Sequence, residues 1–288
     1  MLHSFEELRS PNQELSFKQI NDYVYKKSGK RTISGLMTDD GFYNNYAYMI
    51  SDQCPWHFII RTDGYDMVFD GPLPVQLEQC YEHLRENSPF TTILHRVAKY
   101  RCYPSSAILE TLVNATLHFD ASRMSPIVIE LERDLMNITS PGGLLPPQEW
   151  TDIVTTNPRN RRMADLMVSL KYASLKGRGL SMIKSGYHTS GLVPCFIRTE
   201  DEFSVRLPSL DMRSRTPEND ANMVLSYLLE HRSATISELS MNTMLSIYAV
   251  KKMVAILEQQ DCVFTMGIGV NRRVYLVNAP KVPKNIVM

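Results

Sequence analysis

The spacing of apolar residues predicts a helix over residues 104–118, within the stretch YPSSAILETLVNATLHFD. A proline is tolerated in the first turn of a helix, so the helix can begin there. One face is apolar and is formed by Ile108, Leu112 and Ala115. The other face carries polar side chains at four-residue spacing, Glu110, Asn114 and His118. Residues four apart share a helix face, so this polar stripe is either a solvated surface or one wall of a site.

The same reasoning predicts the elements on both sides of this helix. Helical periodicity is found in residues 16–27, with Gly29 just past the end of the helix. It is also found in residues 73–88, 159–175 and 176–187, the last opening with a glycine-rich turn. Short β-type runs are found in residues 56–61, 67–70 and 91–100. Two hairpins are expected, over residues 125–140 and 195–208. The chain is therefore expected to mix helices with antiparallel strands.

The last part of the chain has a different pattern. The polar stretch DMRSRTPEND, residues 211–220, predicts a boundary. Helices are expected over residues 217–232, 235–243 and 246–260, with Thr235 or Ser237 capping the second. A hairpin around Gly267 and Gly269 follows. Three helices followed by a β-hairpin is the order of a winged helix-turn-helix domain.

Composition adds general limits to this picture. The 288 residues are 43% hydrophobic and 22% charged, which is ordinary for a globular protein of two or three domains. Lys plus Arg and Asp plus Glu both number 31, which does not suggest a strongly basic nucleic-acid binder. The five cysteines show no CxxC spacing, so no zinc or redox motif is visible. With no apolar leader and no run of about 20 apolar residues, we expect a soluble, cytoplasmic protein.

The polar stripe could support phosphate chemistry. The amide oxygen of Asn114 could hold a hydrated Mg²⁺, and the carboxylate of Glu110 could orient a water. Two glycine-rich segments follow, SPGG at residues 140–143 and GRG at residues 177–179. Glycines allow backbone N–H groups to converge on an anion. Each motif also has a purely structural interpretation: an exposed helix face for the polar stripe, a plain loop for SPGG and a helix start for GRG. Each motif alone is therefore weak evidence for a phosphate site.

Together these motifs resemble a known family. The segments YPSSAILETLVNATLHFD, NITSPGGLL, NPRNRRMADLM and GRGLSMI are similar to the carboxy-terminal region of the RecG-related transcriptional regulators, which have a GHKL-type ATPase fold. The resemblance spans roughly residues 12–208 and implies binding of ATP and Mg²⁺. It implies that Glu110 is the catalytic acid and Asn114 the magnesium ligand. The other nucleotide-binding positions that it implies are His118, Asp120, Gly142, Gly143, Gly177, Arg178 and Gly179.

The chain departs from that family at three points. The family commonly reads His-Arg-Asp-Tyr where this chain has His118-Phe119-Asp120-Ala121. The wider GHKL group reads adenine with an aspartate, and the matching position here is Thr139 or Ser140. The Schlafen/Alba-like domain usual upstream is missing, so we interpret the chain as a short member or a fragment. No GxxxxGK[ST] motif occurs, so motor activity is not supported.

The predicted winged helix suggests contacts to DNA. From residue 216 onward there are seven basic and six acidic residues, a net charge of +1, which is low for a DNA-binding module. We expect the third helix and the wing to supply the contacts, through Ser246, Tyr248, Lys251, Lys252, Arg272 and Arg273. A protein-contact role is the alternative.

The predicted fold is therefore α+β. It comprises a mixed segment at residues 1–100, a GHKL-like α/β sandwich at residues 101–210 and a winged helix at residues 216–280. The leading functional hypothesis is a DNA-binding transcriptional regulator whose nucleotide-binding domain is active or vestigial. A Mg²⁺-dependent ATPase is the second hypothesis. A non-catalytic scaffold that forms a homodimer through the winged helix is the third.

Overall fold

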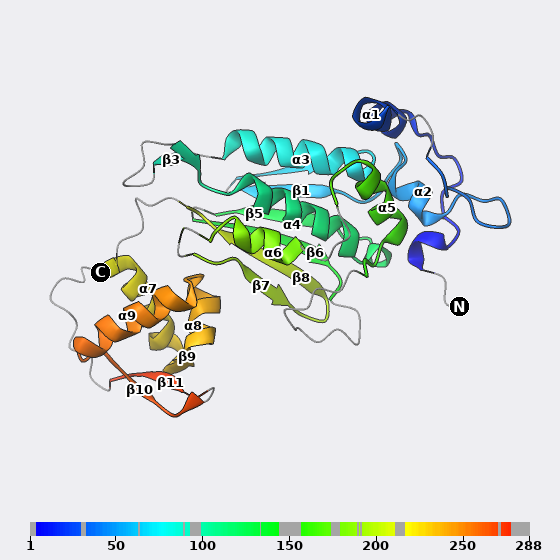
Figure 1. Cartoon of the computed structure of the whole chain (residues 1–288). Helices are drawn as coiled ribbons and strands as arrows, with labels where there is room; N and C mark the ends of the chain where they lie inside the picture. The colour runs from blue at the N-terminus through cyan, green and yellow to red at the C-terminus, as the bar shows by residue number, and fades with distance from the viewer. Residues whose placement is uncertain are drawn as a thin grey trace. The chain divides into compact units, whose positions relative to one another are not determined.

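A computed structural model of the chain describes most of its residues (Figure 1). The described segments are residues 4–29, 33–62, 64–88, 90–92, 99–132, 134–143, 157–173, 179–188, 190, 192–210, 217–269 and 272–277. The fold is α+β, as predicted, and these segments contain nine α-helices. By contacts the chain divides into two units, with residues 1–88, 103–186 and 196–207 in the first and the remainder in the second.

The first unit is built on a six-stranded mixed sheet. Its strands follow the order β2-β1-β5-β6-β8-β7; β1 pairs with β5 in parallel, whereas β1 with β2 and β5 with β6 are antiparallel. The strand bounds are β1 Phe58–Thr62, β2 Tyr65–Phe69, β5 Ile127–Leu131, β6 Leu135–Pro141, β7 Cys195–Arg198 and β8 Glu202–Pro208. Strands from the predicted segments 1–100 and 101–210 therefore share this sheet, and the division between those two segments stays a prediction.

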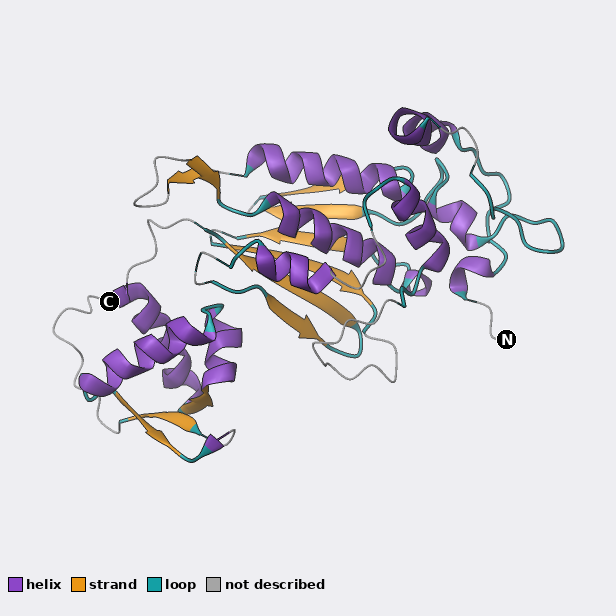
Figure 2. Cartoon of the chain, viewed as in Figure 1, coloured by secondary structure: helices purple, strands orange, loops and turns teal. Residues whose placement is uncertain are grey.

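Helices cover one face of the sheet, which makes a two-layer α/β sandwich (Figures 1 and 2). These helices are α3 Leu73–Asn87, α4 Ser105–His118 and α6 Gly179–Ser185. Alternate strand residues point toward them and are buried, for example Phe58, Ile60, Ile127 and Ile129. Helix α4 contributes its apolar face to this core, because Ile108 and Leu112 are 0% exposed and Ala115 is 6% exposed.

The N-terminal segment and α5 complete the first unit. Helix α5 is Arg161–Ser169, α1 is Lys18–Ser28, α2 is Asn45–Met49, and the short 3-10 turns are η1 Phe5–Glu7 and η2 Ala121–Arg123. Helix α1 ends as predicted at Gly29, whose φ of 70° is the left-handed conformation that glycine adopts most readily. Neither α2 nor η1 was predicted, because both are too short to show a period.

The second unit contains three helices and a three-stranded sheet. The helices are α7 Pro217–His231, α8 Ile236–Thr243 and α9 Ile247–Gln259. The sheet has the order β10-β11-β9, with β9 Ser233–Thr235, β10 Val263–Met266 and β11 Arg273–Leu276. Thr235 caps α8 and Glu238 bonds back to it, as the capping pattern predicted. Identification of this unit as a winged helix stays a prediction.

One predicted strand was wrong in its extent. Residues 91–100 do not form one strand but contribute to two antiparallel strands, β3 Phe90–Thr92 and β4 Lys99–Arg101. The sequence pattern predicted β-structure here correctly, but periodicity alone does not show where the chain turns back between two strands. In the part of the chain that the structure describes, no helix is long and apolar enough to cross a membrane.

Candidate functional site

The polar stripe of α4 faces α6. The sheet takes the apolar side of α4, and α6 packs closely against α4, which leaves Glu110, Asn114 and His118 half-buried. The Asn114 amide donates a long hydrogen bond to Glu110 Oε1, at 3.5 Å. Among the described residues this is the one hydrogen bond recorded for either side chain. The stripe is therefore a partly covered polar wall and not a fully solvated surface.

Gly179, the first residue of α6, lies directly against this stripe. A Cβ atom at Gly179 would lie 2.6 Å from Glu110 Oε1 and 2.7 Å from Asn114 Nδ2, closer than van der Waals contact allows. The glycine therefore permits a close approach of backbone to two polar side chains. This explains why the sequence has glycine here, and it brings three predicted site residues together.

Burial changes the ionisation of the stripe. Burial raises the pKa of Glu110, while the hydrogen bond from Asn114 acts in the opposite direction. Burial, with the positive charge of Arg159 as a smaller cause, lowers the pKa of His118 to about 4. His118 is therefore neutral at pH 7, and Glu110 is the one acidic group of the stripe.

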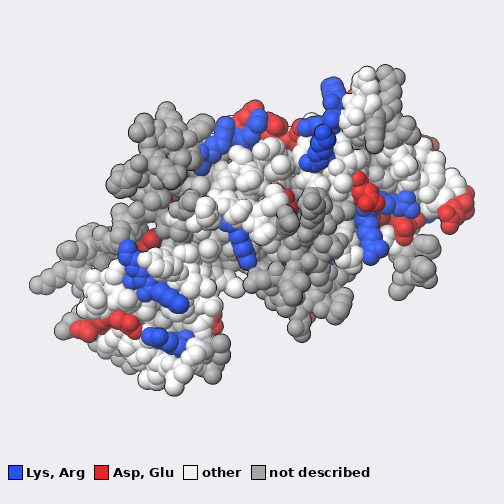
Figure 3. Space-filling model, in the orientation of Figure 1, with Lys and Arg blue, Asp and Glu red and all other residues white. Residues whose placement is uncertain are grey.

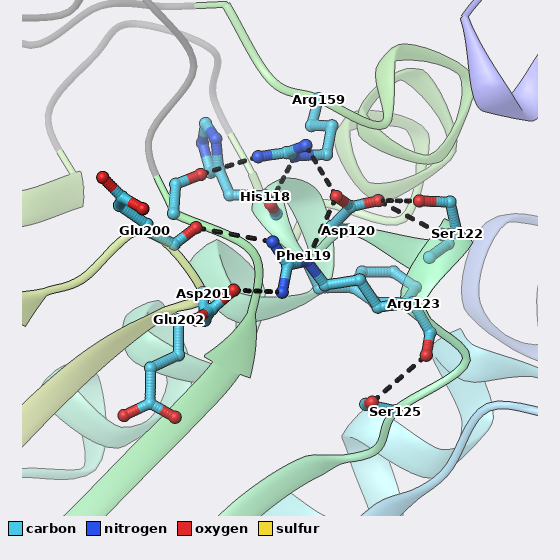
Figure 4. Close-up of polar contacts among 12 residues, drawn as sticks. His118, Phe119, Asp120, Ser122, Arg123, Ser125, Arg159, Glu200, Asp201 and Glu202 are labelled. Carbon is cyan, nitrogen blue, oxygen red and sulfur yellow. Dashed lines mark hydrogen bonds and ion pairs between the residues drawn. The ribbon is translucent and has the colours of Figure 1, made fainter.

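Asp120 belongs to a second group of polar residues just beyond the end of α4, here called the Asp120 cluster (Figure 4). The Asp120 carboxylate accepts bonds from Ser122 N and Oγ and forms ion pairs with Arg159 at 3.2 Å and Arg123 at 3.5 Å. Burial raises the pKa of Asp120, but the Ser122 hydrogen bonds and the charge of Arg159 outweigh it and leave the pKa low. Among the described contacts, Asp120 is thus fully occupied within the protein.

The two arginines connect this cluster to neighbouring loops. Arg159 donates from Nη2 to the Gly143 carbonyl at 2.6 Å and from Nε to the His118 carbonyl at 3.2 Å. Arg123 donates to Asp201 Oδ1 at 2.8 Å. Figure 4 shows these side chains converging from the end of α4, the start of α5 and the β7–β8 turn. The cluster therefore fixes several loops at one end of the sheet.

The SPGG loop differs from what the sequence suggested. The N–H of Gly142 donates to the Asp201 carbonyl at 2.6 Å, and the N–H of Gly143 donates to the Glu200 carbonyl at 3.3 Å. Both groups expected to face an anion are therefore used to hold the β7–β8 turn. The glycines are required for another reason, since a Cβ at Gly142 would overlap the Asp120 Cβ and one at Gly143 would overlap the Thr199 carbonyl.

The positions that match the adenine-reading aspartate carry hydroxyl groups that are already bonded. Thr139 Oγ1 lies 2.8 Å from Ser204 Oγ, and Ser140 Oγ donates to the Phe203 carbonyl at 3.3 Å. Both pairs join β6 to β8. Neither position therefore carries a carboxylate of its own.

Some site residues lie outside this description or were missed. Gly177 and Arg178 are outside the described residues. The roles of Arg159, Arg123 and Asp201 were not predicted from the sequence. The stretch NPRN contains Arg159 and was one of the motifs of the resemblance, but neither charge nor spacing indicated that its partners are 16 to 41 residues distant.

The donor atoms of the stripe suit one kind of metal ion. Mg²⁺ takes few protein ligands, all oxygen, and keeps several waters. A half-buried carboxylate beside an amide oxygen fits that requirement. The described residues contain no group of three His, Cys, Asp or Glu side chains that could hold a metal ion by themselves.

In the second unit, the predicted contact residues differ in availability. Tyr248 is 79% exposed, and Lys251 and Lys252 are exposed on the same helix, α9. Ser246 is the N-cap of α9, and its hydroxyl accepts from Ala249 N. Arg272 is exposed, whereas Arg273 pairs with Glu238 at 3.1 Å and donates to the Ser233 carbonyl. On the face shown in Figure 3, acidic and basic side chains are interspersed.

Comparisons with known proteins support part of this picture. No curated protein matches the chain. A solved structure of the DIP2311 protein from Corynebacterium diphtheriae is similar in fold, with 14% identity and a TM-score of 0.56, over 96% of this chain and 70% of that chain. At that identity the likeness shows the fold alone.

A family model described as "Putative ATP-dependent DNA helicase recG C-terminal" matches residues 125–207. The match includes the SPGG loop and Gly179 but begins after α4, so Glu110 and Asn114 lie outside it. Residues 125–207 are therefore similar to an ATPase-like, RecG-related family.

Proposed function

We propose that the first unit binds a magnesium–nucleotide complex at the polar stripe of α4. The observation that carries this proposal is the contact of Gly179 with Glu110 and Asn114, where the backbone approaches a carboxyl group and an amide so closely that a Cβ atom would have to displace both side-chain ends. The match of residues 125–207 to an ATPase-like family supports it. Asn114 would hold the ion through its amide oxygen, and Glu110 would orient a water. When bound, Mg²⁺ neutralises charge on the phosphates.

Hydrolysis is expected to be very slow or undetectable. Thr139 and Ser140 stand where related ATPases carry the adenine-reading aspartate, and both hydroxyls are bonded within the sheet. The N–H groups of Gly142 and Gly143 are also engaged. Because these groups would otherwise contact the base and the phosphates, we expect binding to depend on Mg²⁺ and the α4 stripe, with slow turnover at most.

Isothermal titration calorimetry with ATP and Mg²⁺ tests this proposal. Wild-type protein should bind, and Asn114→Ala should lose at least about tenfold in affinity, the equivalent of roughly 1.4 kcal/mol. The matched control is Asn21→Ala, which removes an exposed asparagine from α1 and should bind as wild type does. Absence of binding by wild type at millimolar ATP would refute the proposal. Steady turnover lost in Glu110→Gln would show instead that the unit is an active ATPase.

We propose duplex DNA binding as a function of the second unit, because α9 exposes Tyr248, Lys251 and Lys252 together. In a winged helix this helix would enter the major groove and the wing would lie along the backbone. A transcriptional regulator follows if both units act together. The alternative is a protein contact, including a homodimer.

Salt dependence of DNA binding separates these two roles. Lys251→Ala/Lys252→Ala should weaken binding and lower the slope of log K against log salt by about 0.9 for each lost phosphate contact. Arg272→Ala should lower it by the same amount. Arg273→Ala should mainly destabilise the unit, since its guanidinium pairs with Glu238. If wild type shows no duplex binding at low salt, a protein-contact role replaces this proposal.

A further inference from the structure

The start of helix α5 is held by a residue from the other end of the chain. Glu6 is 1% exposed, and its Oε2 accepts from Arg162 N and its Oε1 from Met163 N, both at 2.9 Å. These N–H groups belong to the first turn of α5, where no helical partner exists. The helix's own N-cap, Asn160, uses its side chain elsewhere and donates to the Thr116 and Phe119 carbonyls. Glu6 therefore performs the capping role from 156 residues away.

Further contacts attach the same segment to its surroundings. The Asn45 amide donates to the Phe5 carbonyl at 3.0 Å, and Asn45 N donates to the Leu8 carbonyl at 2.9 Å. Arg162 donates to the Gly35 carbonyl at 3.1 Å and lies 3.6 Å from Glu7. Residues 4–10, here called the N-terminal brace, are thus fixed between α2 and the first turn of α5.

The residues immediately before α5 reach the candidate site. Arg159 donates to the carbonyls of Gly143 and His118, and Asn160 N donates to the Leu117 carbonyl at 3.0 Å. His118 is the last residue of the polar stripe. The start of α5 therefore contacts Glu6 as well as the end of the polar stripe and the glycine loop.

We propose that the N-terminal brace sets the geometry of the candidate nucleotide site through α5, with Glu6 as the positioning residue that fixes the start of this helix. The effect on nucleotide binding rests on the proposed function. The effect of Glu6 on the start of α5 and on the loop at Gly143 does not. If Glu6 is removed, the first turn of α5 loses its acceptors, and Arg159 with the loop at Gly143 becomes less well held.

Protonation provides a way to follow this coupling. Burial raises the pKa of Glu6 to about 7, although the N–H groups of Met163 and Arg162 and the charge of Arg162 lower it. The other ionisable groups around it are Glu7 on η1 and Tyr46 on α2. The pKa of Glu6 in the folded protein is raised above its ordinary value of 4.5. Its favourable contribution to the free energy of unfolding is therefore full below pH 4.5 and is lost as pH rises through about 7.

Hydrogen exchange on the full chain tests the structural part. In Glu6→Gln and Glu6→Ala, the amides of Arg162 and Met163 should exchange at least about tenfold faster, since the pair of carboxyl oxygens that accepts from both N–H groups is lost. The amides of Gly142 and Gly143 should also exchange faster, because Arg159 is less well held. Glu14→Gln, which changes an exposed glutamate just after the N-terminal brace, is the matched control and should change none of them. Glu6→Gln should also remove the dependence of thermal stability on pH between about 5 and 7.

Each outcome decides a different claim. Faster exchange at Arg162 and Met163 with unchanged exchange at Gly142 and Gly143 would overturn the proposal and leave Glu6 as a cap without influence on the site. Faster exchange at all four amides, with weaker binding of ATP and Mg²⁺, would support it. If wild type binds no nucleotide, the proposed function fails, and the four amides alone still decide whether the brace positions the loop.

Discussion

Two polar groups of residues occupy neighbouring parts of the first unit, and they differ in how their polar atoms are used. The stripe residues Glu110 and Asn114 share one hydrogen bond of 3.5 Å among the described contacts. The carboxylate of the Asp120 cluster instead has two hydrogen bonds and two ion pairs. Buried polar groups in proteins are normally bonded, so the cluster is organised as structure, while the stripe retains capacity for a ligand.

The comparison changes the role of Asp120. The family resemblance suggested that Asp120 contacts nucleotide, as it did for Glu110 and Asn114. In the structure its carboxylate is occupied by Ser122, Arg159 and Arg123. We therefore infer that Asp120 organises loops, and that a ligand would meet the stripe and not this carboxylate.

The largest effect on stability should come from breaking the Asp120 cluster. Arg159→Ala removes an ion pair and hydrogen bonds to two carbonyl groups, and it leaves Asp120 with one fewer cation. We expect the free energy of unfolding to fall by about 3 kcal/mol. Urea unfolding measures this change. The matched control is Arg161→Ala, which removes an exposed arginine two residues later. It should change the free energy of unfolding by less than about 0.5 kcal/mol. Equal effects of the two substitutions would show that the cluster is not specially stabilising.

A smaller effect is expected at the glycine loop. Gly142 has φ +90° and a Cβ there would overlap Asp120, whereas Gly41 has φ +81° and has nothing within 4 Å. Gly41→Ala therefore reports backbone strain alone, of roughly 1 kcal/mol. Gly142→Ala should destabilise by about 1 kcal/mol more, because the cluster must shift. Thermal or urea unfolding of both variants gives the difference, and a difference near zero would mean that the loop adapts without disturbing Asp120.

The smallest effect on stability should occur at the stripe. In Gly179→Ala the new methyl group meets only the ends of the Glu110 and Asn114 side chains, which can rotate away. Alanine also favours a helix more than glycine does, so stability should change by less than about 1 kcal/mol. Binding of ATP and Mg²⁺ should nevertheless be lost, as calorimetry can measure. Retained binding would show that the close approach at Gly179 has no part in the site.

Much of the fold follows from local sequence patterns. Pro104 and the apolar positions Ile108 and Leu112 predicted α4 correctly, and two β-branched, apolar runs predicted the hairpin of β5 and β6. Gly29 marked the end of α1 because its left-handed φ suits glycine. These features depend on residues a few positions apart, so one sequence contains the necessary information.

The network around Asp120 could not be predicted in this way. Arg123 pairs with Asp201, 78 residues later, and Glu6 caps a helix 156 residues later. Such pairs depend on the tertiary arrangement, which neither periodicity nor composition specifies. The SPGG loop illustrates the consequence, since its N–H groups were expected to face an anion but instead bind carbonyls of the β7–β8 turn.

The most direct test of the difference between the two groups is NMR observation of their side-chain N–H signals during one titration. ¹⁵N-labelled protein would be titrated with ATP and Mg²⁺, while the Asn114 amide and the Arg159 Nε–H are followed. We predict a saturable shift of the Asn114 signal and an almost unchanged Arg159 signal. An unchanged Asn114 signal, or a larger shift at Arg159 than at Asn114, would contradict the assignment of the stripe to ligand binding and of the Asp120 cluster to structure.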